Sequence, residues 1–141
     1  MATYTINEVS QKFDLPSSTL RYYEDAGLLT NVARTPSGQR IYADCHLNRL
    51  GAICCFKRTG MSIAQLQAFF RYEADEPGHI DDILTLLDKQ RQAMERHMRE
   101  LEADHAHMLR KLHYYRAIKA AAAAGAPHPD WADYKNAVFT K

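Results

Sequence analysis

The sequence predicts a mostly α-helical chain, in which a small domain containing a β-hairpin is followed by one long helix. Three observations predict this class. Two short helices joined by a turn fit residues 5–27, a β-prone hairpin fits residues 30–43, and no Gly or Pro interrupts residues 80–118. A polar segment with Pro and Gly at 73–78 marks the expected boundary. We therefore expect a domain over residues 1–73, a long helix over 79–119 and a tail over 120–141.

Composition is that of an ordinary globular protein, with 46% hydrophobic and 25% charged residues among 141. The longest apolar run, Ala120–Ala124, is too short to cross a membrane, and the N-terminus lacks a signal-peptide pattern. Three cysteines, an odd number, favour reduced thiols. We therefore expect a cytoplasmic protein with no membrane partner. The net charge of +1 gives no argument for nucleic-acid binding by itself.

The first short helix has a clear start signal. Thr5 can cap a helix over Ile6–Phe13, and Glu8 is placed to complete a capping box. Three apolar residues of this helix repeat at helical spacing and predict an inward face: Ile6, Val9 and Phe13.

The stretch Ser17–Leu29 carries the main functional prediction. Ser17 and Ser18 can cap its first amides, and Gly27 is a natural stop in the left-handed region. Leu20 and Tyr23 share one face, which leaves Ser18, Arg21 and Tyr22 pointing outward. An Arg can bind guanine or phosphate in a major groove, and hydroxyls can reach phosphate. With the preceding helix this forms a helix-turn-helix pattern (residues 5–27), although an ordinary helical hairpin would have the same spacing.

A β-hairpin is expected next, at about residues 30–43. β-Prone residues flank the turn Pro36-Ser37-Gly38. A hairpin that follows a helix-turn-helix is a wing, and Arg34, Arg40 and Tyr42 would then face a phosphate backbone. The alternative is a surface hairpin with ordinary charges.

A second helix pair is expected over residues 44–72. Asp44 can cap a helix from Cys45 to about Thr59, and Gly60 can end it. Ser62 can cap a further helix over Ile63–Tyr72. The inward residues are predicted to be Leu47, Leu50, Ile53, Cys54, Ile63, Leu66, Phe69 and Phe70.

The long helix has a heptad pattern, interrupted at position a only by Arg91 and His105. One helix cannot bury this seam, and a hairpin would need a turn inside the run, so we expect a coiled coil with a second copy. Beyond it, Ala120–Ala124 can extend the helix to Gly125. In the tail, four large apolar residues either form a short docked helix or lie loose: Trp131, Tyr134, Val138 and Phe139. The expected dimerisation residues are Leu84, Leu87, Met94, Met98, Leu101, Met108, Leu112 and Tyr115.

These motifs together resemble the MerR family of bacterial transcription regulators. The resemblance is carried by Leu20-Arg21-Tyr22-Tyr23-Glu24, Gly27-Leu28-Leu29, Arg34, Gly38-x-Arg40-x-Tyr42 and Gly60-Met61-Ser62-Ile63. It implies a winged helix-turn-helix DNA-binding domain, an antiparallel coiled-coil homodimer, and a promoter dyad that is distorted for RNA polymerase. Gln39 stands where the family often has an aromatic residue. The expected DNA-binding residues are Ser17, Ser18, Thr19, Arg21, Tyr22, Arg34, Gly38, Arg40, Tyr42, Lys57 and Arg58.

The segment Cys55–Ile63 resembles the aldehyde- and electrophile-responsive, NmlR- or AdhR-like branch, which implies a sensor cysteine in this helix. Cys55 is the preferred sensor and Cys54 the weaker candidate, since Cys54 shares the inward side. Lys57 and Arg58 could lower the thiol pKa. The alternative is that both cysteines are small core residues.

No metal or cofactor is expected. All three cysteines precede residue 60, whereas the metal-responsive branches resemble one another in carrying cysteines at and after the end of the long helix. The spacing of His97, His105, His107 and His113 does not favour chelation. No catalytic set stands out, so an enzyme is the weakest alternative. A coiled-coil module that binds another protein, or a regulator of this type that senses a metal or other ligand, remains open.

Overall fold

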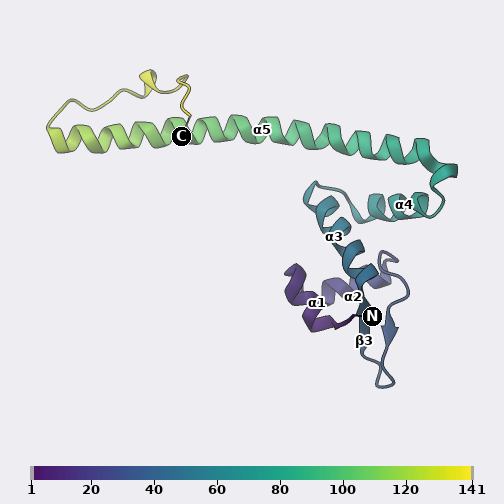
Figure 1. The fold of residues 1–141 in the computed structure, drawn as a ribbon. Helices are drawn as coiled ribbons and strands as arrows, with labels where there is room; N and C mark the ends of the chain where they lie inside the picture. Colours follow the sequence, from purple (N-terminus) through teal and green to yellow (C-terminus); the bar gives the residue numbers. More distant parts are fainter. Residues whose placement is uncertain (1, 141) are drawn as a thin grey trace. The chain divides into compact units, whose positions relative to one another are not determined.

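The computed structural model describes residues 2–140, which are mostly helical (Figure 1). Residues 1 and 141, at the ends of the expected first domain and tail, lie outside the described part. The chain divides into two compact units, one ending at Gln92 and the other beginning at Ala93. This division lies within a helix, whereas the sequence suggested a boundary at 73–78. None of the helices in the described part is long and apolar enough to cross a membrane.

The elements follow the predicted order. They are β1 (Thr3–Thr5), α1 (Ile6–Phe13), α2 (Ser17–Asp25), β2 (Ala33–Arg34), β3 (Arg40–Ala43), α3 (Asp44–Arg58), α4 (Ile63–Glu73), α5 (Glu76–Ala124) and the 3₁₀ helix η1 (Trp131–Asp133). The predicted mostly α-helical class is confirmed.

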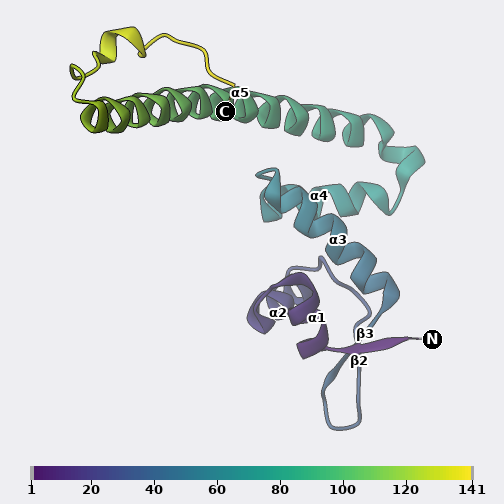
Figure 2. The same cartoon turned by 60° about the vertical axis from the view of Figure 1, so that its left-hand side comes forward.

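A small antiparallel sheet joins the N-terminus to the wing. Its strand order is β1-β3-β2, with Tyr4 opposite Tyr42 and Arg34 opposite Arg40. The hairpin of β2 and β3 turns through Gly38, whose φ of +87° is costly for other residues (Figure 2). The hairpin is therefore the expected wing, and β1 anchors its second strand to the body of the domain.

The core of the first unit lies between the helices α1 to α4 and strand β3. Each fully buried Leu contributes about 1.5–3 kcal/mol relative to exposure. The predicted inward faces of α2, α3 and α4 are confirmed for Leu20, Tyr23, Leu50 and Leu66. The complete buried set is Val9, Leu20, Tyr23, Leu28, Leu29, Tyr42, Leu47, Leu50, Ile53, Met61, Leu66 and Phe70.

Two of the predicted helix starts are confirmed. The Glu8 amide donates to the Thr5 hydroxyl and the Thr5 amide donates to the Glu8 carboxylate, each at 3.2 Å. Ser62 and Gln65 form the same reciprocal pair at the start of α4. Such a box satisfies two backbone donors that the helix leaves without partners.

The expected caps of α2 and α3 were wrong. At α2 the cap position belongs to Pro16, which has no side-chain acceptor, and Ser17 is already helical. At α3, Asp44 is the first helical residue, and its carboxylate accepts a hydrogen bond from the Tyr4 hydroxyl at 2.8 Å. In both cases the helix starts one residue earlier than the cap prediction required.

His46 performs the capping at α3 instead. Nδ1 of this buried side chain accepts a hydrogen bond from the Ala43 amide at 2.9 Å. Its Nε2 then carries the proton and donates to the Thr30 carbonyl, also over 2.9 Å. One imidazole therefore joins the segment before the wing, the end of the wing and the start of α3.

We expect His46→Ala to lower the free energy of unfolding by about 2–4 kcal/mol, because it leaves a cavity and two backbone groups without partners. Urea unfolding of the full chain at fixed protein concentration measures this loss. Asn48→Ala, at an exposed position of the same helix, serves as the control and should change stability by less than about 0.5 kcal/mol. Equal losses in the two variants would contradict the capping role.

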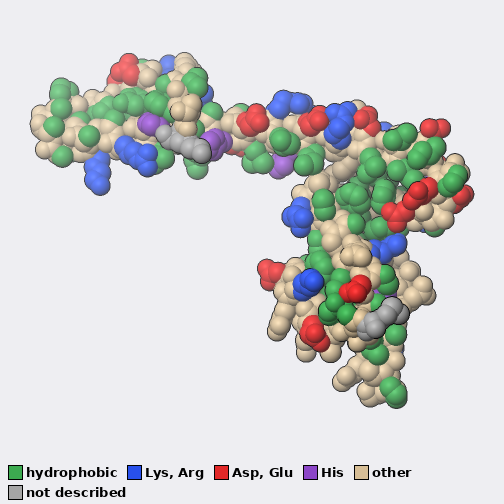
Figure 3. Space-filling view, in the orientation of Figure 1, with side chains coloured by type: hydrophobic (Ala, Val, Ile, Leu, Met, Phe, Trp, Pro, Cys, Tyr) green, Lys and Arg blue, Asp and Glu red, His purple; other side chains and the backbone are tan. Residues whose placement is uncertain are grey.

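Helix α5 has one irregularity, at His79 (φ −130°, ψ 20°). In the first unit Leu86 packs against the core, and Gln90 donates to the Thr59 carbonyl at 2.6 Å. Hydrophobic side chains reach the surface between charged ones along this helix (Figure 3). The eight heptad residues are between 36% and 66% exposed: Leu84, Leu87, Met94, Met98, Leu101, Met108, Leu112 and Tyr115.

In the second unit the tail docks on the end of α5. Gly125 reverses the chain with φ +66°, and Arg110 donates from Nε to the Ala137 carbonyl at 2.8 Å. The rings of Trp131 and Tyr134 lie 5.2 and 5.4 Å from that of Tyr114. The docked alternative is therefore the one observed, except that Val138 is 88% exposed.

Candidate nucleic-acid interface

Helix α2 presents the polar face that the sequence predicted. Burial of Leu20 and Tyr23 turns Ser18, Arg21 and Tyr22 to the surface. Ser17 and Thr19, at the start of the helix, are half-buried. The helix ends at Asp25, and Gly27 is the expected stop just after it, with a φ of +78°; the Leu28 amide donates to the Tyr23 carbonyl.

A cluster of three charged side chains joins the wing to the end of α2. The carboxylate of Glu24 contacts Arg40 Nε at 2.5 Å and Arg34 Nη2 at 3.6 Å. The other terminal nitrogen of Arg34 donates to the Gly38 carbonyl at 3.2 Å. Both strands of the wing are therefore held by a single residue of α2.

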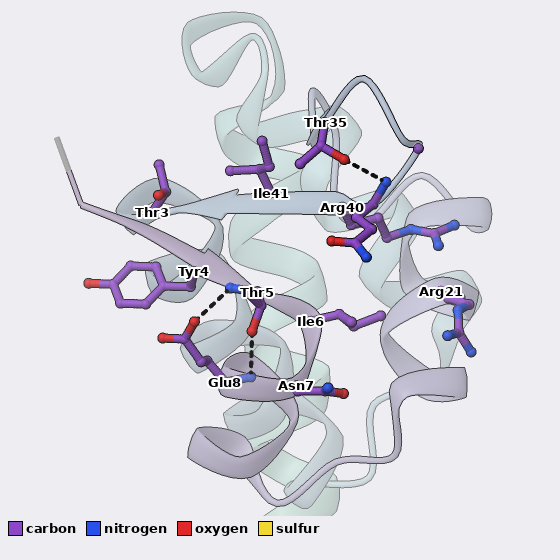
Figure 4. Close-up of a pocket in the computed structure, with 12 residues that line it drawn as sticks. Thr3, Tyr4, Thr5, Ile6, Asn7, Glu8, Arg21, Thr35, Arg40 and Ile41 are labelled. Atoms are coloured by element: carbon purple, nitrogen blue, oxygen red, sulfur yellow. Dashed lines mark hydrogen bonds between the residues drawn. The ribbon is translucent and has the colours of Figure 1, made fainter.

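A groove of about 630 Å³ runs between the N-terminal strand, α2 and the wing. Arg21 from α2 and Arg40 from β3 lie on the same side of it, and the side chain of Ile6 points toward Arg21 (Figure 4). Gly38 and Gln39 at the wing tip line it as well. The structure thus brings together the arginines that were predicted to bind DNA from two separate segments.

The expectation that Tyr42 faces a phosphate backbone was wrong. Its side chain is 0% exposed, its hydroxyl has no hydrogen-bond partner within residues 2–140, and burial raises its pKa. Side chains of a strand alternate, so Tyr42 shares a face with Arg40. At Tyr42 the helices cover this face, whereas Arg40 lies two residues nearer the tip and its side chain remains partly exposed.

Lys57 and Arg58 belong to a different part of the surface. They line a pocket of about 390 Å³ at the end of α3, together with Lys12, Tyr23 and Cys54. None of the outward residues of α2 or of the wing lines this pocket. The structure therefore does not group these two cations with Arg21 and Arg40.

The two candidate sensor thiols have different surroundings. Cys55 is exposed, and Cys54 is half-buried in the pocket. Burial raises the pKa of Cys54, and the nearby charge of Arg58 lowers it by less. The cations expected to assist Cys55 thus lie with Cys54. Within residues 2–140, no three His, Cys, Asp or Glu side chains gather as metal ligands would.

Sequence reasoning missed two residues that organise this surface, Glu24 and His46. The signal for Glu24 was its place on α2, three residues after Arg21, which turns it toward the side on which a wing would lie. For His46 the signal was its third position in a helix whose cap residue, Ala43, has no side-chain acceptor. Neither signal identifies a partner before the hairpin is placed.

Comparisons with known proteins agree with this geometry. Residues 4–73 match the family described as "MerR HTH family regulatory protein", and residues 47–110 match "MerR, DNA binding". An uncharacterized HTH-type transcriptional regulator of Haemophilus influenzae is 31% identical over 118 residues, which are 84% of this chain and 87% of the relative. The regulator AdhR of Bacillus subtilis is 39% identical over 61 residues, 43% of this chain and 44% of AdhR.

A solved structure has the same fold. The crystal structure of HiNmlR, described as a MerR family regulator lacking the sensor domain and bound to promoter DNA, has a TM-score of 0.76 and 30% identity, covering 89% of this chain and 92% of that one. The family matches together extend over residues 4–110, which include the helix-turn-helix, the wing and much of α5. The chain therefore belongs to the MerR family and is a DNA-binding transcriptional regulator, not an enzyme.

Proposed function

We propose that two copies of this chain bind a promoter dyad, with α2 of each copy in a major groove and each wing on the adjacent backbone. The observation that carries the proposal is the exposed face of Ser18, Arg21 and Tyr22, with Arg34 and Arg40 held beside it. The crystal structure of HiNmlR, in which a regulator of the same family is bound to promoter DNA, supports the same use of this fold. Ser17, Thr19 and Gly38 are proposed to contribute backbone or hydroxyl contacts to phosphate.

A gel shift of promoter duplex at increasing NaCl concentration tests the DNA contacts. Each Lys or Arg bound to phosphate releases counterions, so the logarithm of the binding constant should fall linearly with the logarithm of the salt concentration. Alanine variants of Lys57 and Arg58 extend the test to the second group of cations. A binding constant that does not change with salt concentration would contradict contacts of Arg21, Arg34 and Arg40 with phosphate.

The heptad residues of α5 are proposed to form an antiparallel coiled coil with a second copy. Eight large apolar side chains are exposed on one chain, which is costly in water. A second copy supplies the same sequence, and Arg91 and His105 at position a can fix the register. Dimer geometry would then set the separation of the two α2 helices on DNA.

We further propose that the dimer switches transcription by distorting the DNA between the half-sites, which aligns the elements that RNA polymerase binds. Cys55 is the proposed sensor, because a solute can reach its exposed thiol. The thiolate sulfur bonds to the carbonyl carbon of an aldehyde, and the carbonyl oxygen takes a proton from water to give a hemithioacetal. This adduct on α3 would favour one of two DNA-bound conformations.

Reporter induction by formaldehyde or methylglyoxal should fall to below about a tenth in Cys55→Ala cells and persist in Cys54→Ala and Cys45→Ala cells, because only the proposed sensor forms the adduct. If induction is lost only in Cys54→Ala cells, the sensor is Cys54, in the pocket with Lys57 and Arg58. Equal induction in all variants would contradict the thiol mechanism. Neither outcome bears on DNA binding.

A further inference from the structure

Glu24 contacts both arginines of the wing from the last turn of α2. Its two carboxylate oxygens are divided between them, Oε2 to Arg40 at 2.5 Å and Oε1 to Arg34 at 3.6 Å. The side chains of Glu24 and Arg40 are only 20% and 18% exposed, so this pair is partly shielded from water. The hydrogen bond to Glu24 also raises the pKa of Arg40.

The contact leaves the outer part of the Arg40 guanidinium available. Glu24 accepts from the inner Nε, and no hydrogen bond of the two terminal nitrogens of Arg40 is found within residues 2–140. A guanidinium has five N–H donors, so four remain for an outside acceptor. Arg34 is similarly held at Nη1 by the carbonyl of Gly38 and at Nη2 by Glu24. Glu24 therefore orients the Arg40 guanidinium by a hydrogen bond, whereas it holds Arg34, whose side chain is 47% exposed, by a longer ion pair.

A carboxylate at this position has a cost for DNA binding. Its charge repels phosphate, and it offsets one of the two positive charges of the wing. Binding driven by charge alone would be stronger without Glu24. For DNA binding, Glu24 is an advantage only where the orientation of the arginines matters more than their total charge, which is the case for specific binding.

We propose that Glu24 is a positioning residue for specific DNA recognition. It holds Arg34 and Arg40 at a fixed separation from Arg21, so that the wing and α2 bind the duplex as one rigid unit. This inference rests on the proposed contacts of the two wing arginines with DNA. It assigns Glu24 no contact with DNA.

The test compares specific and non-specific binding by the full chain. Dissociation constants are measured for a dyad duplex and for a scrambled duplex of equal length. Glu24→Ala should weaken specific binding about tenfold and leave non-specific binding unchanged or stronger, so the ratio between them falls at least about tenfold. Glu24→Gln retains an oxygen that can accept from Arg40 Nε, and it should recover part of the ratio.

Asp25→Ala is the matched control, because Asp25 is the adjacent exposed carboxylate and the change in net charge is the same. It should strengthen both kinds of binding alike. An equal response in Glu24→Ala would show that only charge matters and would overturn the positioning role. If Glu24→Ala fails to fold, as judged by thermal unfolding, the Gln variant still gives the comparison.

A double-mutant cycle separates this inference from the function on which it rests. If Glu24 acts through Arg40, adding Glu24→Ala to Arg40→Ala should cause little further loss of specific binding. Fully additive losses would overturn the inference. If Arg40→Ala changes neither dissociation constant, the proposed wing contact itself fails, and the inference fails with it.

Discussion

A Met98→Glu variant is expected to be monomeric at micromolar concentration and to bind a dyad duplex at least about 100-fold more weakly than the natural chain. Met98 is 49% exposed in the single chain and lies at position a near the middle of the heptad stripe. In a coiled coil with a second copy, the new carboxylate would enter an apolar seam, where an unpaired charge costs several kcal/mol. The dimer would carry this cost twice.

Sedimentation velocity of the full chain measures the effect on assembly. Ala103→Glu is the control, since Ala103 is exposed and falls at position f of the same heptad, farthest from the seam. It should leave both dimerisation and DNA binding unchanged. A dimeric Met98→Glu chain, or equal loss in both variants, would contradict the assignment of the seam.

Arg21→Ala is expected to weaken binding to a dyad duplex by about 10- to 100-fold, equivalent to about 1–3 kcal/mol. Arg21 is exposed on the outward face of α2 and lines the groove with Arg40. If it binds phosphate, the salt slope per half-site should fall by about 0.9; if it binds a guanine, specificity at that base should relax instead.

Lys12→Ala removes an equal charge at an exposed position of α1, on the pocket that contains Cys54. Gel shifts of the two variants at several NaCl concentrations give both the affinities and the slopes. If Arg21→Ala weakens binding to the dyad duplex no more than Lys12→Ala does, the proposed contact of α2 with DNA is contradicted.

Features that depend on residues close in sequence could be predicted. The capping box of Thr5 and Glu8 spans three positions, and the stop at Gly27 depends on one residue's freedom to adopt positive φ. The expected bounds of α1 match, and those of α4 differ by one residue. Local propensity and apolar spacing determine these features, so tertiary contacts did not change them.

Features that depend on packing could not be predicted. Glu24 and Arg40 are 16 positions apart in the sequence, and their hydrogen bond exists only after the hairpin docks beside α2. The burial of Tyr42 likewise depends on which helices cover β3, although its spacing from Arg40 already placed both on one face. Cys54 and Cys55 are neighbours whose exposure is decided by the pocket between α1 and α3. The charged cluster that orders the candidate interface is therefore a tertiary feature.

Two copies of α2 and its wing are proposed to bind a two-fold DNA site. To test this, the full chain is used to select duplexes from a random-sequence pool, and the mass of its complex with a selected duplex is then measured. We expect inverted repeats whose half-sites are separated by about one helical turn or a multiple of it, with two 16.1 kDa chains on each duplex. A single unrepeated site bound by one chain, or no enrichment of any sequence, would contradict this proposal.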